Sequence, residues 1–243
     1  MCQLLSLSSN KNVDIQLSLR EFSHRGKYNP HGWGFAFYSD DKWEVVKEPG
    51  SLADVDTKSE RFMFKSKIII GHVRLASCGT KCHLNTHPFQ RNGWAFAHNG
   101  TVSSIMYNKE FRLNTIKPLG QTDSEYAFCY LLEKIGQETH ANKIKEILQT
   151  EAEKIKQHGN FNFLLSDGKM LYAYGDDKLF FVQRKAPFQE VTLKDEGYSI
   201  HLSEIKSPEE KAILVATEPL TTGEAWKKFS GIKMFENGDE VRV

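Results

Sequence analysis

Short apolar segments separated by turn residues dominate the chain, and this pattern predicts a protein rich in β-strands. Residues 67–75 form a β-branched run typical of a buried strand, and residues 94–98 form a second apolar run that ends at Asn99-Gly100. Asp167-Gly168 is a strong hairpin signal between two later runs. Further strands are predicted at residues 3–8, 34–38, 43–47, 161–166, 171–174, 179–183, 212–216 and 240–243.

Helical periodicity is clear in the middle of the chain. Apolar residues recur at helical spacing over residues 123–135, behind the capping sequence Thr122-Asp123-Ser124-Glu125. Residues 140–158 place isoleucines and a leucine among lysines and glutamates, as in an amphipathic surface helix. Weaker helical patterns cover residues 14–22 and 51–64. Strands at both ends with helices between them predict an α+β architecture, with helices packed outside sheets.

Composition limits the classes of function. The 243 residues are 40% hydrophobic and 26% charged, as in an ordinary globular protein, and no linker or repeat divides them, so we expect a single domain over residues 1–243. With 32 basic and 31 acidic residues there is no basic excess, and no apolar run approaches a membrane span. We therefore expect no nucleic-acid or membrane partner. The N-terminus does not resemble a secretory signal, so we expect a cytoplasmic protein with four reduced cysteines.

Cys2 is the first candidate catalytic residue. Removal of Met1 would leave a thiol and a free α-amino group on the same residue. An α-amino group titrates at about 8, so it is a suitable base for its own thiol at neutral pH. The position is equally compatible with an ordinary small residue after the initiator methionine.

Three further polar features lie at the ends of predicted elements. Asn99 and Gly100 close a strand, where they form either an oxyanion hole or a common Asn-Gly turn. Arg74 ends a buried strand and needs an anion, which is either a ligand carboxylate or a structural partner. Asp123 begins a helix, as a first-turn acid or as the partner of a ligand ammonium. Arg74 and Asp123 together would form a clamp for an α-amino acid.

A zinc site is the alternative interpretation of a segment rich in cysteine and histidine. Thiolates and imidazoles are zinc ligands, but the spacing matches no common zinc pattern. We therefore expect no metal and no cofactor. The residues concerned are His72, Cys78, Cys82, His83 and His87.

Five short signatures occur in a fixed order along the chain: Met1-Cys2, His24-Arg25-Gly26, Gly71-His72-Val73-Arg74, Ala97-His98-Asn99-Gly100 and Thr122-Asp123-Ser124-Glu125. Together they resemble the class II glutamine amidotransferases, which are N-terminal-nucleophile hydrolases. The resemblance covers nearly the whole chain and is closest to the stand-alone type of the family. It implies a four-layer αββα sandwich, in which two antiparallel sheets stack between helices.

The resemblance also implies a reaction. Cys2, exposed by loss of Met1, would attack the γ-amide of glutamine and release ammonia and glutamate through a γ-glutamyl thioester. Asn99 and the N–H of Gly100 match the family's oxyanion donors. Arg74 matches the residue that binds the α-carboxylate, and Asp123 the one that binds the α-ammonium. The remaining positions on the substrate side are Arg25, Gly26, Ser77 and His98.

Two departures from the family pattern leave the substrate open. Leu75 and Cys78 replace a tryptophan and a histidine that flank the glutamine pocket in the branch that aminates sugar phosphates. Other γ-glutamyl amides or peptides are therefore alternative substrates, and a glutamine-binding module without catalysis is a third interpretation. Because the chain has no room for a synthase domain, an ammonia acceptor would be a separate subunit.

Overall fold

Strands make up most of the regular structure in the computed structural model, which describes residues 1–242. No helix in this range is long and apolar enough to cross a membrane. The α-helices are α1 (Gln16–Ser23), α2 (Asp123–Ile135) and α3 (Ala141–Ile155). The strands are β1 (Gln3–Val13), β2 (Trp33–Ser39), β3 (Lys42–Glu48), β4 (Ser66–Val73), β5 (Phe89–Arg91), β6 (Trp94–Gly100), β7 (Phe161–Ser166), β8 (Leu171–Lys185), β9 (Glu190–Leu193), β10 (Ser199–His201), β11 (Lys211–Ala216), β12 (Thr221–Thr222), β13 (Lys227–Glu236) and β14 (Asp239–Val241).

One hydrogen-bonded path joins most strands, in the order β3-β2-β4-β1-β11-β8-β7-β6-β5. The long strand β8 belongs to both halves of this antiparallel sheet. Its residues 171–174 pair with β7, whereas residues 180–185 pair with β11. β13 follows β8 along both parts. A separate three-stranded sheet has the order β10-β9-β12.

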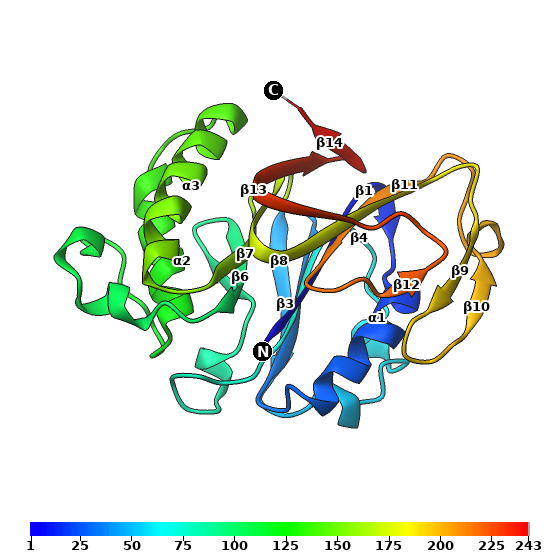
Figure 1. The fold of residues 1–243 in the computed structure, drawn as a ribbon, viewed down its shortest axis with the longest axis horizontal. Helices are drawn as coiled ribbons and strands as arrows, with labels where there is room; N and C mark the ends of the chain where they lie inside the picture. The colour runs from blue at the N-terminus through cyan, green and yellow to red at the C-terminus, as the bar shows by residue number, and fades with distance from the viewer. Residues whose placement is uncertain (243) are drawn as a thin grey trace.

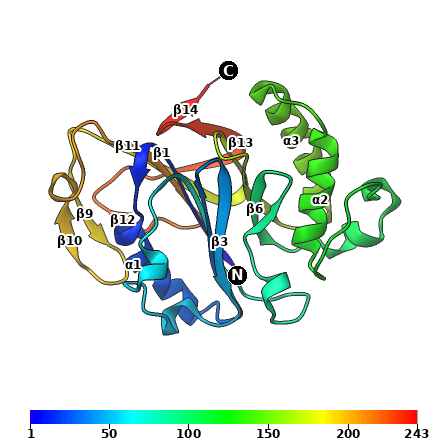
Figure 2. The ribbon, with the colours of Figure 1, turned by 180° about the vertical axis from the view of Figure 1, so that it is seen from behind.

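The two halves of the large sheet stack face to face. Leu4 of β1, Ile70 of β4 and Leu164 of β7 share one buried apolar cluster between them. α2 and α3 cover the outer face of the half that contains β6 and β7, and α1 covers the other outer face (Figure 1 and, from behind, Figure 2). The expected α+β class and the αββα sandwich are therefore confirmed. The small sheet lies beside α1, where the helical layer is only eight residues long (Figure 1).

The capping sequence before α2 forms the predicted helix start. The Thr122 hydroxyl accepts the backbone N–H of Glu125 at 3.1 Å. The Glu125 carboxylate turns back to the preceding loop and accepts the N–H groups of Leu119 and Gly120, at 2.9 and 2.6 Å. The first turn of α2, which contains Asp123, is thus fixed to the loop in front of it.

Residues 51–64 do not form the helix that their weak pattern predicts. The segment contains two short 3-10 turns, Leu52–Asp54 and Glu60–Phe62. Short polar side chains here bind the backbone instead of leaving it to a helix, since Asp56 accepts the N–H of Lys58 at 2.9 Å.

The other elements differ from expectation in smaller ways. The predicted strands at residues 171–174 and 179–183 are one strand, β8. The helix predicted over residues 140–158 ends earlier, at Ile155, and continues as a 3-10 turn. The C-terminal strand predicted at 240–243 is β14, and Val243 lies outside the described residues. β13 was not predicted.

Candidate active site

Cys2 lies directly before β1, which the neighbouring strands β4 and β11 hold in the sheet. Its Sγ accepts the N–H of Leu75 at 3.2 Å and lies 3.4 Å from the Leu75 carbonyl oxygen, to which the thiol can donate. Burial raises the pKa of the Cys2 thiol, against smaller opposing effects of the Leu75 hydrogen bond and the charge of Arg74. The thiol is therefore protonated at neutral pH and needs a base before it can attack.

Asn99 reaches Cys2 from β6, on the other half of the sheet. Its Nδ2 donates to the backbone carbonyl of Cys2 and to the hydroxyl of Thr217, the latter at 3.3 Å. Gly100 follows with a φ of +151°, and a Cβ at this position would lie 1.7 Å from the carbonyl oxygen of Asn160. Only glycine fits such a close approach. The structure thus brings Asn99 against Cys2, with Gly100 next along the strand.

Arg74 directly follows β4, and its guanidinium is buried. Nη2 donates to the carbonyl of Cys78 at 2.7 Å, and Nη1 donates to the carbonyl of Thr80 at 3.2 Å. Burial lowers the pKa of Arg74, and nearby thiols and Asp123 act in the opposite direction. An arginine stays charged at neutral pH despite such a shift. These hydrogen bonds hold the loop that follows Arg74 against its positively charged guanidinium.

Asp123 is also buried, and donors surround its carboxylate. Oδ2 accepts the N–H of Val102 at 2.7 Å and the hydroxyl of Ser103 at 3.1 Å. Oδ1 accepts the N–H of Ser124 at 2.9 Å and the thiol of Cys78 at 3.3 Å. These donors hold both oxygens of the carboxylate in place.

Cys78 contacts both charged residues. Its carbonyl oxygen accepts from Arg74, and its thiol donates to Asp123. A guanidinium and a carboxylate on either side of one small residue have the charges that bind the α-carboxylate and the α-ammonium of an amino acid. The structure therefore places the two halves of the predicted clamp together, and Leu75, next to Arg74, places them beside Cys2.

Ser77 and His98 lie on different sides of this site. The Ser77 hydroxyl is exposed and accepts from the Thr101 hydroxyl at 3.1 Å, just beyond Gly100. The ring of His98 faces α2, where Nδ1 lies 2.8 Å from the Ser124 hydroxyl. His98 therefore supports the first turn of α2, and its direct contact with a substrate stays a prediction.

Arg25 and Gly26 lie on the α1 side of the sheet. Arg25 Nη1 is 4.0 Å from a carboxylate oxygen of Glu218, whose other oxygen accepts from Gln3 at 3.4 Å. A Cβ on Gly26 would lie 2.4 Å from the backbone nitrogen of Ala53, so the segment packs closely. Glu218 thus connects this segment to Gln3, and a contact of Arg25 or Gly26 with a substrate stays a prediction.

The cysteine and histidine side chains of the segment considered for zinc do not converge on one point. Within residues 1–242, no three histidine, cysteine, aspartate or glutamate side chains are arranged to hold a metal ion. Cys82 accepts from the Thr80 hydroxyl at 3.4 Å, away from the thiol of Cys78. His72 and His87 lie against each other with ring centroids 4.1 Å apart and their planes tilted by 39°; both are buried, and none of their ring nitrogens has a hydrogen-bond partner.

Thr217 belongs to the site but was not expected there. Its hydroxyl accepts the N–H of Leu4 at 2.8 Å and also accepts from Asn99, so it ties β1 to the end of β6. Thr217 follows β11, more than a hundred residues from Asn99 in sequence. The sequence assigned Thr217 no role, because only the fold brings Leu4 and Asn99 to its hydroxyl.

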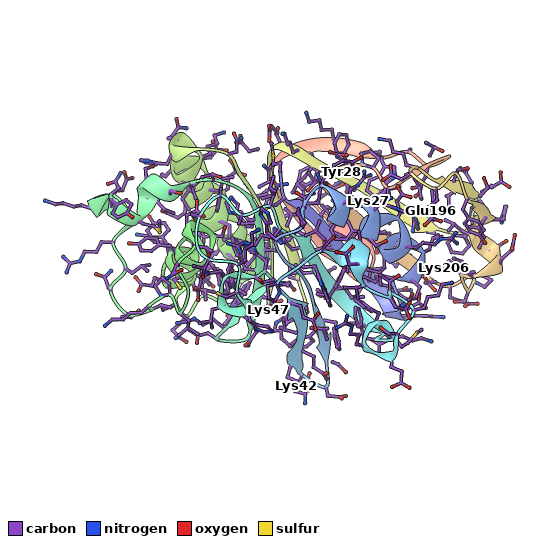
Figure 3. All side chains as sticks on the ribbon, turned by 90° about the horizontal axis from the view of Figure 1, so that it is seen from below. Lys27, Tyr28, Lys42, Lys47, Glu196 and Lys206 are labelled. Carbon is purple, nitrogen blue, oxygen red and sulfur yellow. The ribbon has the colours of Figure 1, made fainter. Side chains whose placement is uncertain are left out.

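A cavity of about 660 Å³ lies elsewhere, between α1, the outer face of the sheet and the segment around β10. Leu7 and Leu214 contribute to its apolar lining. Glu196 and Lys206 also line it and lie at the end of the molecule opposite α2 and α3 (Figure 3). Among the described residues, no cysteine lines this cavity.

The fold is an αββα sandwich, and a cysteine lies directly before its first strand, close to a buried arginine and a buried aspartate. The family model for glutamine amidotransferases class-II matches residues 1–243, and the chain belongs to this family. It is 35% identical to the Escherichia coli K12 protein named "Putative glutamine amidotransferase YafJ", over 94% of each chain. It is 41% identical to "Uncharacterized protein MJ1515" of Methanocaldococcus jannaschii, over 99% of this chain and 71% of that protein.

Solved structures agree with this assignment. A predicted glutamine amidotransferase from Pseudomonas aeruginosa PA01 superposes with a TM-score of 0.74 and 30% identity, and the match covers all of both chains. The glutamine phosphoribosylpyrophosphate amidotransferase of B. subtilis shares the fold, with a TM-score of 0.66 and 17% identity over 99% of this chain and 48% of that one. The family resemblance drawn from the sequence signatures is thus confirmed.

Proposed function

We propose that this protein hydrolyses the γ-amide of glutamine, with Cys2 as the nucleophile after loss of Met1. One observation carries the proposal: Cys2 contacts Asn99 on one side and Leu75 on the other, and Leu75 directly follows one half of the Arg74–Asp123 pair. A thiol, an amide donor and an amino-acid receptor therefore meet at one place.

The proposed reaction requires a base on Cys2 itself. In the chain with Met1, the nitrogen of Cys2 is a peptide nitrogen, which cannot accept a proton. Loss of Met1 makes it an α-amino group, whose pKa of about 8 suits the removal of the thiol proton. Because burial raises the pKa of this thiol, an internal base is the more necessary.

The atoms then balance in two steps. Sγ bonds to the γ-carbonyl carbon, and the oxygen gains a negative charge that Asn99 Nδ2 and the Gly100 N–H stabilise. The amide nitrogen then takes the proton held by the α-amino group, and the C–N bond breaks. Ammonia departs, and a γ-glutamyl thioester remains on Cys2. Water then gives a proton to the α-amino group and attacks the thioester carbon, which releases glutamate and restores the thiol. Loss of one such oxyanion donor typically costs about 10²–10³ in rate.

Mass spectrometry with a glutamine-shaped electrophile tests the nucleophile. The intact mass of the purified protein is measured before and after exposure to diazo-oxo-norleucine. We expect the loss of one methionine and a single adduct that maps to Cys2, absent in Cys2→Ala and retained in Cys129→Ala, since Cys129 is a buried residue of α2. Hydrolysis by protein that retains Met1, or an adduct elsewhere, would overturn the mechanism.

A panel of γ-glutamyl compounds identifies the substrate. Preferred release of ammonia from glutamine supports the proposed activity and a separate ammonia-accepting synthase subunit as partner. Faster cleavage of γ-glutamyl amides or peptides would instead make the protein a γ-glutamyl hydrolase with the same nucleophile. Binding of glutamine without turnover would make it a binding module.

A further inference from the structure

The two charged residues of the clamp lie on segments that are far apart in sequence. Arg74 opens a loop that follows β4, and Asp123 opens α2 behind another loop. An amino acid held at both ends needs a fixed distance between guanidinium and carboxylate. Cys78 contacts both charged residues directly, and a buried amide forms a second connection between the two segments.

Asn85 is this connection. Its side chain is 1% exposed. Nδ2 donates to the carbonyl of Thr80 at 3.1 Å, and the same carbonyl accepts from Arg74. Oδ1 accepts the N–H of Gln121 at 2.8 Å, two residues before Asp123. Nδ2 also lies 3.4 Å from the side-chain oxygen of Gln121, so one amide bonds the Arg74 loop and the Asp123 segment together.

Two glycines show how closely both segments approach this amide. A Cβ on Gly79 would lie 2.9 Å from Nδ2 of Asn85, and Gly79 has a φ of +71° that favours glycine. A Cβ on Gly120 would lie 2.5 Å from Oδ1. Larger residues at either position would displace the amide. The amide of Asn85 is therefore closely enclosed by both segments.

We propose that Asn85 is a positioning residue that sets the distance between the Arg74 guanidinium and the Asp123 carboxylate. This inference rests on the proposed function, because it concerns the span of the glutamine receptor. Asn85 touches neither the thiol nor the predicted ligand groups. Its effect is expected only for ligands that bind both ends of the clamp.

Two substrates separate this role from simple structural support. L-Glutamine carries both α-groups, whereas glutaric acid monoamide has the same amide and carboxylate but no ammonium. In Asn85→Ala, we expect kcat/KM for glutamine to fall about tenfold to a hundredfold, as for the loss of two or so buried hydrogen bonds, mainly through a higher KM. The value for the monoamide should change less than about twofold, because a singly held ligand does not sense the span.

The reactivity of Cys2 provides a second readout. Alkylation by iodoacetamide, which lacks an amino-acid end, should proceed at the wild-type rate in Asn85→Ala. Asn85→Asp has nearly the same shape as the wild type and keeps the acceptor for Gln121, but it loses the donor to Thr80. This variant decides the question if the alanine variant does not fold. Asn10→Ala is the matched control, since the Asn10 amide bridges Glu209 and Lys211 with bonds of 2.9 Å at the far end of β1.

The outcomes are distinct. Selective loss for glutamine in either Asn85 variant, with unchanged alkylation and an unaffected Asn10 variant, supports the inference. Equal losses for both substrates, or no loss, would overturn it while the proposed function stands. If the wild-type protein cleaves no γ-glutamyl compound, the proposed function itself fails, whether or not the protein binds L-glutamate.

Discussion

The buried pair of His72 and His87 leads to a quantitative prediction about acid stability. Burial lowers the pKa of His72 to about 3, and the charges of His98 and Arg74 add to this effect. Burial also lowers the pKa of His87 well below its ordinary value. Both rings are neutral in the folded protein at pH 5, whereas the unfolded chain binds a proton on each below a pH of about 6.5.

The sign and size follow from linkage. Below a pH of about 6.5 the unfolded chain binds protons on these histidines, whereas the folded protein does not. The free energy of unfolding therefore falls as the pH drops, and for His72 this fall continues towards pH 3. Between pH 7 and pH 5, one histidine whose pKa is lowered this far reduces the free energy of unfolding of the protein by about 2 kcal/mol. The replacement His72→Leu removes one such group from a mostly apolar layer. We expect its loss of stability over this pH range to be about 2 kcal/mol smaller than that of the wild type.

Urea unfolding at pH 7 and pH 5, followed by fluorescence or circular dichroism, measures this difference. The comparison of two pH values cancels any pH-independent cost of the substitution itself. His140→Leu is the control, because His140 is exposed. If His72→Leu loses as much stability as the wild type between the two pH values, His72 is not a buried neutral histidine and the reasoning is refuted.

Three further predictions concern the framework of the site. Gly100→Ala should abolish activity and lower the melting temperature markedly, whereas Gly93→Ala, whose added Cβ meets nothing within 4 Å, should cost only about 1–2 kcal/mol of backbone strain in thermal unfolding. Arg184→Met should lower the free energy of unfolding by about 3–5 kcal/mol, because Glu224 then stays buried without its partner at 2.5 Å. Adding Glu224→Leu should restore much of this loss. Equal instability of the single and double variants would contradict the prediction. Glu133 accepts three N–H groups of the loop before α2, and its pKa is lowered to about 2. Glu133→Gln should therefore speed trypsin cleavage in this loop. Unchanged digestion would show that these bonds do not hold the loop.

The sequence could predict the parts of the site that local patterns mark. Cys2, Arg74, Asn99 and Asp123 each stand at the end of a strand or the start of a helix, where apolar periodicity stops and a polar side chain is conspicuous. The stacking of two sheets follows from the resemblance and from the amount of strand. These signals are local, so they survive without knowledge of the fold.

The parts that were missed depend on contacts between distant segments. Asn85 and Thr217 received no role from the sequence, because the groups they bond lie on segments that only the fold brings to them. β13 escaped prediction because its register shifts between Phe229 and Gly231, which breaks the period of two that indicates a strand. In residues 51–64 a helical pattern was present, but side-chain hydrogen bonds to the backbone outweighed it.

The layer between the two halves of the sheet has a consequence for protein engineering. Cys2 and Arg74 belong to one half, and Asn99 belongs to the other, so the thickness of this layer sets the distance between the proposed nucleophile and its proposed oxyanion donor. Fully buried alanines keep the layer thin, and larger side chains would push the halves apart. A library scored for turnover rather than for expression should therefore rank these alanines among the least replaceable positions, although none of them touches the substrate. They are Ala36, Ala95, Ala97 and Ala173.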